Sequence, residues 1–135
     1  MKKLLLITLI TISLFGTSCT KDMGGNADMS TVDFIVNKND WFAIGEFGKP
    51  GYGFAIDLSM PEITNNVVQN GMVSLYIKSG ESWIPAPVYF YNDGYQGGYL
   101  YALKRGVFSI EYYENDHKTE LPGTQTFRLV IVQPI

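Results

Sequence analysis

Short apolar runs alternate with turn-forming residues about every eight to twelve positions from residue 31 onward, a spacing typical of β-sandwiches and barrels. The sequence therefore predicts an all-β fold, a small antiparallel β-sandwich of the Ig-like or Greek-key type. Strands are expected at Val32–Asn37, Trp41–Phe47, Phe54–Ser59, Met72–Lys78, Trp83–Tyr91, Tyr99–Arg105, Val107–Glu114 and Thr126–Val132.

Alternation within these runs indicates which side chains face the core. Successive side chains of a strand point to opposite faces, so an apolar residue at every second position marks a half-buried strand. Three sets of core residues are predicted on this basis. They are Phe54, Ile56 and Leu58; Val73, Leu75 and Ile77; and Phe127, Leu129 and Ile131.

One segment, Ile63–Gly71, departs from the strand pattern. Thr64 can cap the N-terminus of a helical turn, with Ile63 packing against Val68 as a hydrophobic staple. Gly71 can provide a left-handed exit. We expect one short helix here, near Asn65–Gln69, in a crossover loop between two strands, with an irregular loop as the alternative.

An apolar leader ends at Cys19, the one cysteine of the chain. Met1–Lys3 forms a positive n-region, Leu4–Phe15 is largely apolar, and Gly16–Ser18 supplies small residues. A membrane-spanning helix needs about 20 apolar residues, and this stretch is shorter and interrupted by threonine and serine. We therefore expect a cleaved lipoprotein signal over residues 1–18 with acylation of Cys19, rather than an ordinary secretory peptide.

The residues around Cys19 resemble the lipobox of Bacteroidota lipoproteins, although Gly16 stands where that motif usually has leucine. Thr20-Lys21-Asp22 resembles the short signal that directs some lipoproteins of that phylum to the outer face of the outer membrane. The resemblance implies a lipid-anchored, surface-exposed protein of the outer membrane, with the periplasmic face as the alternative. Its membrane partner would be reached through the N-terminal lipid.

Without residues 1–18 the chain carries eight basic residues against 13 acidic ones, a formal charge of −5. Because an acidic surface repels phosphates, nucleic acid and anionic lipid headgroups are not expected as partners. Acylation of Cys19 leaves no thiol for a disulfide.

Residues 19–30 are polar and glycine-containing and predict a flexible tether, which leaves residues 31–135 as one domain.

Three further stretches resemble small, uncharacterised Bacteroidota lipoproteins with a C-terminal β-sandwich-like domain. These are Ile63–Gly71, Trp83–Pro87 and Pro122–Arg128, and the likeness spans most of residues 40–133. No activity is assigned to that family, so the resemblance implies fold and location alone.

Catalytic constellations are sparse. His117 is the single histidine and lies in a polar run, no Gly-x-Ser-x-Gly elbow is present, and a zinc site would need more ligands. Glu46, Asp57 and Glu111 fall in predicted strands and could in principle form a glycosidase pair, but acids on a solvated face are commoner. The sequence therefore predicts a protein that is not an enzyme, with a small hydrolase as a remote alternative.

Two acidic runs, Asn92-Asp93-Gly94 and Glu114-Asn115-Asp116, contain oxygen ligands suited to calcium. The same residue types form ordinary turns, and neither run has the spacing of a calcium loop. No metal and no cofactor are expected.

Tyrosines crowd into residues 89–113. Their flat rings with a polar tip suit sugar rings or peptide side chains, whereas aromatic pairs also stabilise any sheet. Tyr95, Tyr99 and Tyr101, on a glycine-rich hairpin, are the candidate ligand-binding residues, for a glycan or a protein. We expect a non-enzymatic binding module, with a structural or assembly subunit of an outer-membrane complex as the alternative.

Overall fold

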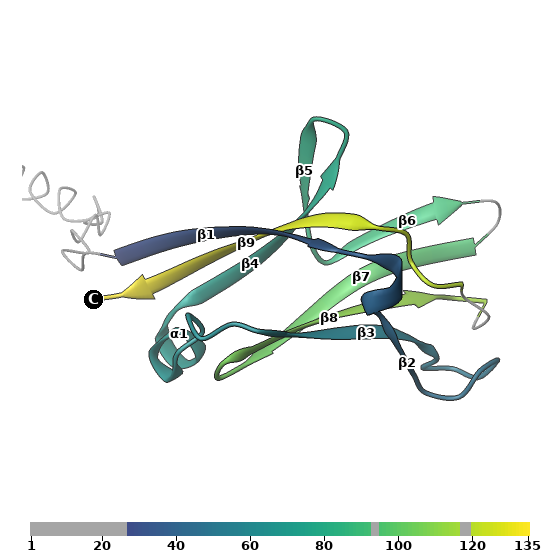
Figure 1. Cartoon of the computed structure of the whole chain (residues 1–135), viewed down its shortest axis with the longest axis horizontal. Coiled ribbons are helices and arrows are strands. Elements are labelled where there is room, and N and C mark those ends of the chain that lie inside the picture. The colour runs from purple at the N-terminus through teal and green to yellow at the C-terminus, as the bar shows by residue number, and fades with distance from the viewer. Residues whose placement is uncertain (1–26, 93–94, 117–119) are drawn as a thin grey trace, which may run out of the picture.

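The computed structural model describes residues 27–92, 95–116 and 120–135, except the side chains of Asn92 and Tyr95. Its strands form two antiparallel sheets that face one another (Figure 1). The first sheet has the order β1 (Ala27–Val36), β9 (Gln125–Pro134), β4 (Met72–Ser79), β5 (Ser82–Pro85). The second has the order β2 (Phe42–Ile44), β3 (Gly53–Ser59), β8 (Val107–Glu114), β7 (Tyr95–Lys104), β6 (Val88–Asn92).

The predicted fold class is confirmed, an all-β sandwich with one short α-helix among the described residues. Strands β6, β7 and β8 form a meander, and its last strand, β8, lies beside β3, which precedes the meander in the chain and is connected to it through β4 and β5 of the first sheet. A meander flanked by a distant strand in this order is a Greek-key arrangement. Within the described part of the chain, no helix is long and apolar enough to cross a membrane.

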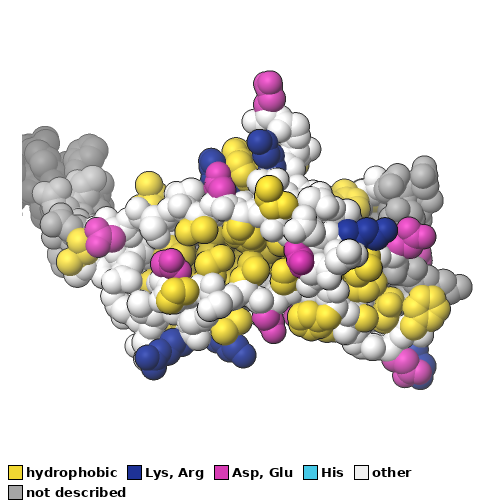
Figure 2. Space-filling model, in the orientation of Figure 1, with side chains coloured by type: hydrophobic (Ala, Val, Ile, Leu, Met, Phe, Trp, Pro, Cys, Tyr) yellow, Lys and Arg dark blue, Asp and Glu magenta, His cyan; other side chains and the backbone are white. Residues whose placement is uncertain are grey.

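The core lies between the two sheets and contains the residues that alternation predicted. Leu75, Phe127 and Leu129 are fully buried, and Leu58 is partly buried against them. In Figure 2, which looks at the side of the sandwich, hydrophobic side chains gather between the layer that holds β1 and the layer that holds β3. The inner faces of both sheets therefore meet in a single apolar layer.

The predicted strand Trp83–Tyr91 is wrong as a single element. The chain leaves the first sheet at Pro85 and joins the second at Val88, with a cis peptide bond between Ala86 and Pro87. Proline has no backbone N–H to donate to a neighbouring strand, so one central strand cannot continue through both Pro85 and Pro87. The segment instead supplies the edge strands β5 and β6 of different sheets.

Strand β1 begins at Ala27, four residues before the domain start expected from the sequence. Residues 27–30 are exposed, so no hydrophobic pattern marks them. Their backbone pairs with the end of β9, where Ala27 faces Pro134. A distant strand, rather than local composition, therefore sets the beginning of β1.

Helix α1 (Asn65–Asn70) lies in the crossover between β3 and β4, as predicted. The Val67 N–H donates to Thr64 Oγ1 at 3.2 Å, which confirms the N-cap. Val67, rather than the expected staple residue Val68, is the side chain of this helix that is buried in the core, and Val68 is exposed. The left-handed exit at Gly71 is also wrong, since its φ is −94°; an added Cβ there would lie 2.4 Å from the Val132 carbonyl oxygen.

The sandwich has two distinct ends, shown left and right in Figure 1. At the N-terminal end β1 begins, β9 finishes, and α1 lies beside the turn between β7 and β8. At the distal end lie the β6–β7 hairpin and the loop between β2 and β3. Strand β1 alone, at roughly 3.3 Å per residue, accounts for about 33 Å between them.

Candidate functional site

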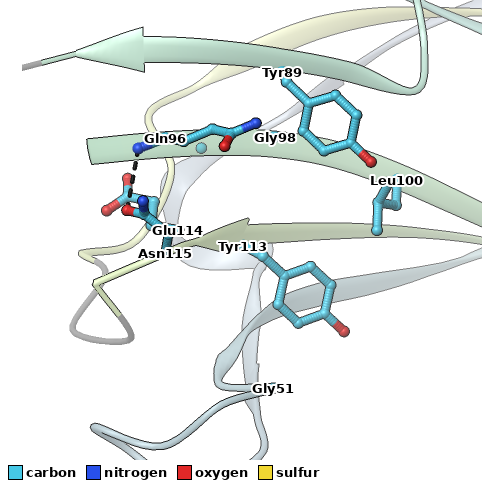
Figure 3. A pocket seen from close by; sticks show the side chains of 9 residues that line it. Gly51, Tyr89, Gln96, Gly98, Leu100, Tyr113, Glu114 and Asn115 are labelled. Atoms are coloured by element: carbon cyan, nitrogen blue, oxygen red, sulfur yellow. Dashed lines mark hydrogen bonds between the residues drawn. The ribbon is translucent and has the colours of Figure 1, made fainter. Parts of the chain in front are cut away.

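A groove of about 290 Å³ lies on the outer face of the second sheet, toward the distal end. We call it the tyrosine groove: Tyr89 and Tyr113 flank it, and Gly98 and Leu100 form its floor (Figure 3). Its size is near the lower end of the range for small-molecule sites. Its surface is mostly apolar, and Gln96, Glu114 and Asn115 form a polar lip at one end.

Strand register places the two rings on either side of a glycine. Gly98 of β7 faces Tyr89 of β6 on one side and Tyr113 of β8 on the other. An added Cβ on Gly98 would lie 2.8 Å from Tyr89 Cδ1, so that ring leans over the glycine. On β3, a Cβ on Gly53 would lie 2.6 Å from Tyr113 Cδ1. Both rings therefore occupy space that side chains would otherwise fill.

The hydroxyl of Tyr113 donates a hydrogen bond to Glu111 Oε2 at 2.8 Å, two residues back on the same strand. Burial, this bond and the charge of Glu111 raise the pKa of Tyr113 to about 12. The ring is therefore held in one orientation and stays neutral at physiological pH. One wall of the groove is thus preorganised.

The polar lip closes the distal end of β7 and β8. The Gln96 N–H donates to Asn115 Oδ1 at 3.1 Å, and the Asn115 N–H donates to the Gln96 carbonyl at 2.9 Å. These bonds fix the backbone where the two strands separate. Both residues line the groove, so hydrogen-bonding groups lie beside its apolar floor.

Tyr89 is the accessible wall, with 58% of its surface exposed on the edge strand β6. A flat ring with a hydroxyl, opposite a second tyrosine, can stack on the apolar face of a sugar or on a planar side chain. The polar lip can bind hydroxyl or amide groups of the same ligand. The arrangement is suited to binding.

Two of the three tyrosines that the sequence suggests for ligand binding, Tyr99 and Tyr101, lie on the inner face of the second sheet rather than in the tyrosine groove. Tyr99 is buried on the inner face, with its ring centroid 4.9 Å from Tyr112 and 5.6 Å from Phe127. Tyr101 is partly buried and donates to the Val73 carbonyl at 3.2 Å. Both rings pack against the core, so neither lines the tyrosine groove, and Tyr99 instead borders a separate cavity of about 320 Å³ beside Phe90. The backbone of Tyr95 begins β7, but its side chain is outside the described part of the structure.

A detectable signal distinguished these two sets of tyrosines. Along β7, Gly98 and Leu100 alternate with Tyr99 and Tyr101, so the tyrosines of this strand share the face opposite the glycine. Tyr89 and Tyr113 belong to the tyrosine cluster of residues 89–113, and crowding alone does not indicate the face on which each one lies. A glycine between two aromatic residues of neighbouring strands indicates such a groove. This arrangement can be identified only when the register between the strands is known.

The carboxylates considered for catalysis each have a local partner. Glu46 lies in the loop after β2 and pairs with Lys49 at 2.8 Å. Asp57 accepts a hydrogen bond from Ser109, and Glu111 accepts the bond from Tyr113. Across residues 27–92, 95–116 and 120–135, no three acidic, histidine or cysteine side chains gather as a metal site would require.

The other residues considered for catalysis or calcium binding are His117 and the two acidic runs. His117, Asp93 and Gly94 are outside the described residues. In the second acidic run, Asn115 uses its side-chain oxygen to accept a hydrogen bond from the Gln96 N–H.

A second groove, of about 270 Å³, lies on the outer face of the first sheet beside Trp83 and Arg128. The Arg128 guanidinium is 4.1 Å from the centre of the Trp83 ring. It also donates two hydrogen bonds, of 2.7 and 2.8 Å, to the Asp33 carboxylate. The Trp83 ring and the Arg128 guanidinium already contact each other, and the guanidinium is also bonded to Asp33. This groove therefore has fewer unoccupied binding groups than the tyrosine groove.

Cys19, the expected acylation site, is outside the described residues. No protein-family model, curated protein or solved structure shows significant similarity to the chain.

Proposed function

We propose that the protein is a lipid-anchored envelope lipoprotein that acts as a non-enzymatic binding module. The tyrosine groove receives a ring-shaped polar ligand, most simply a sugar residue of a glycan. The observation that carries this proposal is the pair of tyrosines, Tyr89 and Tyr113, on either side of the bare glycine Gly98. The leader that ends at Cys19 supports the anchor.

The position of the groove supports the same function. It lies on an exposed sheet face toward the distal end, whereas the chain enters the domain at Ala27, at the other end. A ligand in solution or on a neighbouring surface can therefore approach it. Rings held by a rigid sheet lose little entropy on binding, which favours affinity.

The anchor is tested by intact-mass analysis of the protein from membrane fractions. Cleavage between Ser18 and Cys19 with acyl chains on Cys19 is the expected result, and Cys19→Ser is expected to release the protein. An unmodified soluble form that starts at another residue would contradict the anchor.

The ligand is tested by screening the protein on a glycan panel, with Tyr89→Ala and Tyr91→Ala compared on every positive. Tyr91 is a matched control because it is on the same strand and face, is 81% exposed, and does not line the groove. We expect Tyr89→Ala to weaken binding about tenfold or more, about 1.4 kcal/mol, and Tyr91→Ala to have a smaller effect. Equal losses, or no binding by the parent, would contradict the proposal.

An assembly subunit is the second candidate, and strand β1 favours it. This edge strand of the first sheet has ten residues, contains no proline, and pairs with β9 on one side only. Long unprotected edges are sites of strand addition. Substituting Thr31→Pro at this edge would dissociate such an assembly, as sedimentation would show; unchanged sedimentation would exclude pairing through β1.

A further inference from the structure

Exposed apolar side chains mark the N-terminal end of the first sheet. Met29 of β1, Val132 of β9 and Met72 of β4 are neighbours in register on its outer face, and we call them the apolar row. Met29 is 71% exposed and Met72 is 60% exposed. At about 4.8 Å between strands the row extends roughly 10 Å. Methionine is flexible enough to fit an irregular apolar surface.

Helix α1 adds to the same end. Val68 is 42% exposed, and the helix contacts the end of β9, where Asn66 Nδ2 donates to the Pro134 carbonyl at 3.0 Å. The helix leads directly through Gly71 into Met72. The ends of β1, β9 and β4 and helix α1 lie together where the chain enters the domain (Figure 1), so exposed apolar side chains come from several elements at this end.

The charges at this end balance. Lys104 and Arg105 are exposed at the β7–β8 turn, which is tied to the segment before α1 by the Gly106 N–H and the Ile63 carbonyl at 2.8 Å. Asp28 and Glu62 are exposed at the same end. A surface that meets this end is therefore recognised by its apolar character rather than by its charge.

The chain between Cys19 and β1 is short. Residues 20–26 can extend by at most about 25 Å at 3.6 Å per residue. If Cys19 carries lipid at the membrane interface, the apolar row lies within reach of that interface. The distal end lies a further strand length away, at about 33 Å.

We infer that the N-terminal end of the sandwich rests on the lipid bilayer through the apolar row, with the tyrosine groove held toward the distal end. The inference rests on the proposed acylation of Cys19. The lipid anchor holds the protein on the membrane, and the apolar row sets the orientation of the domain. Because the nearby charges balance, the contact persists at high salt.

A matched pair of probes tests this orientation. Met29 and Ile35 lie on the same strand and outer face, and are 71% and 62% exposed, but differ in distance from the N-terminal end. Met29→Cys and Ile35→Cys are each labelled with bimane, since the acylated Cys19 leaves no competing thiol. The mature lipoprotein is reconstituted in phosphatidylethanolamine and phosphatidylglycerol vesicles that contain a nitroxide-labelled lipid. Met72→Cys serves as a second probe of the row.

We expect strong quenching at positions 29 and 72, little at 35, and no change when salt is raised. Vesicle-bound protein with equal quenching at 29 and 35 would overturn the inference, because the domain would lie flat or stand clear of the bilayer. Stronger quenching at 35 would also overturn it. Protein that fails to float with the vesicles would contradict the acylation, and with it the proposed anchor.

Discussion

The inner and outer faces of the β6–β7–β8 meander use the same residue type in opposite ways. On the inner face Tyr99 is 8% exposed and packs between Tyr112 and Phe127. On the outer face Tyr89 is 58% exposed and leans over Gly98. Strand face, rather than tyrosine density, therefore decides which tyrosines pack in the core and which line the proposed binding groove. The following substitutions test that separation.

The largest effect is expected from Tyr99→Ala. Removal of a large buried ring costs about 3–5 kcal/mol, a substantial share of the about 5–15 kcal/mol that stabilises a domain. Thermal or urea unfolding measures this cost. The reverse pattern, with Tyr99→Ala leaving stability within about 0.5 kcal/mol and Tyr89→Ala destabilising strongly, would exchange the roles of the two faces.

A smaller loss is expected from Gly98→Ala, which fills the floor of the groove. The new Cβ would lie 2.8 Å from both Tyr89 Cδ1 and the Val88 carbonyl oxygen, so the ring and the strand must shift. Overpacking of this kind costs about 1–3 kcal/mol, and ligand binding should be lost with it. Gly123→Ala is the control, because nothing lies within 4 Å of its added Cβ. Equal unfolding curves and intact binding for both variants would count against a glycine floor.

At alkaline pH one tyrosine on each face is expected to contribute to the loss of stability, through a different carboxylate neighbour. Burial and the charge of Glu114 raise the pKa of Tyr99 to about 12, and burial and Glu111 do the same for Tyr113. Tyrosine in the unfolded chain ionises near 10, so this stability is present below pH 10 and is lost as pH rises toward 12. The melting temperature should fall less steeply over this range in Tyr113→Phe than in the parent.

A spectrophotometric tyrosine titration sharpens the same test. Glu111→Gln should lower the pKa of Tyr113 and leave that of Tyr99 unchanged, because only the outer ring depends on Glu111. If Glu111→Gln left the titration unaltered, the Tyr113 ring would not be held as described.

The smallest effect is expected on the outer face of the first sheet. The hydrogen bonds from Arg128 lower the pKa of Asp33 below its ordinary value of 3.8. The stability from this pair is therefore present above pH 3.8 and is lost as pH falls through the lowered pKa. The melting temperatures of the parent and Asp33→Asn should differ slightly at neutral pH and converge in acid. Asp28→Asn, on the same strand, is the control.

Local pattern was sufficient to predict the strand faces. Val73, Leu75 and Ile77 are buried because side chains alternate strictly along a strand, and that rule needs no knowledge of neighbouring strands. The N-cap at Thr64 is local in the same sense, since it involves residues three apart. These features depend on the segment itself.

Features set by distant partners were not predictable in this way. Gly71 is required by the approach of the Val132 carbonyl, and Ala27 joins β1 because Pro134 lies opposite. The tyrosine groove depends on the register that brings Gly98 of β7 between Tyr89 of β6 and Tyr113 of β8. Alternation placed Tyr99 and Tyr101 on one face, but only the packing of the two sheets shows that this face is the core.

The proposed binding site is the tyrosine groove rather than another face of the sandwich. Backbone amide chemical shifts measured by NMR during titration with the strongest glycan from the panel test it most directly. We expect saturable shifts at Gln96, Gly98 and Asn115 and none at Trp83 or Arg128. Shifts centred on Trp83 and Arg128, with the Gly98 amide unmoved, would contradict it.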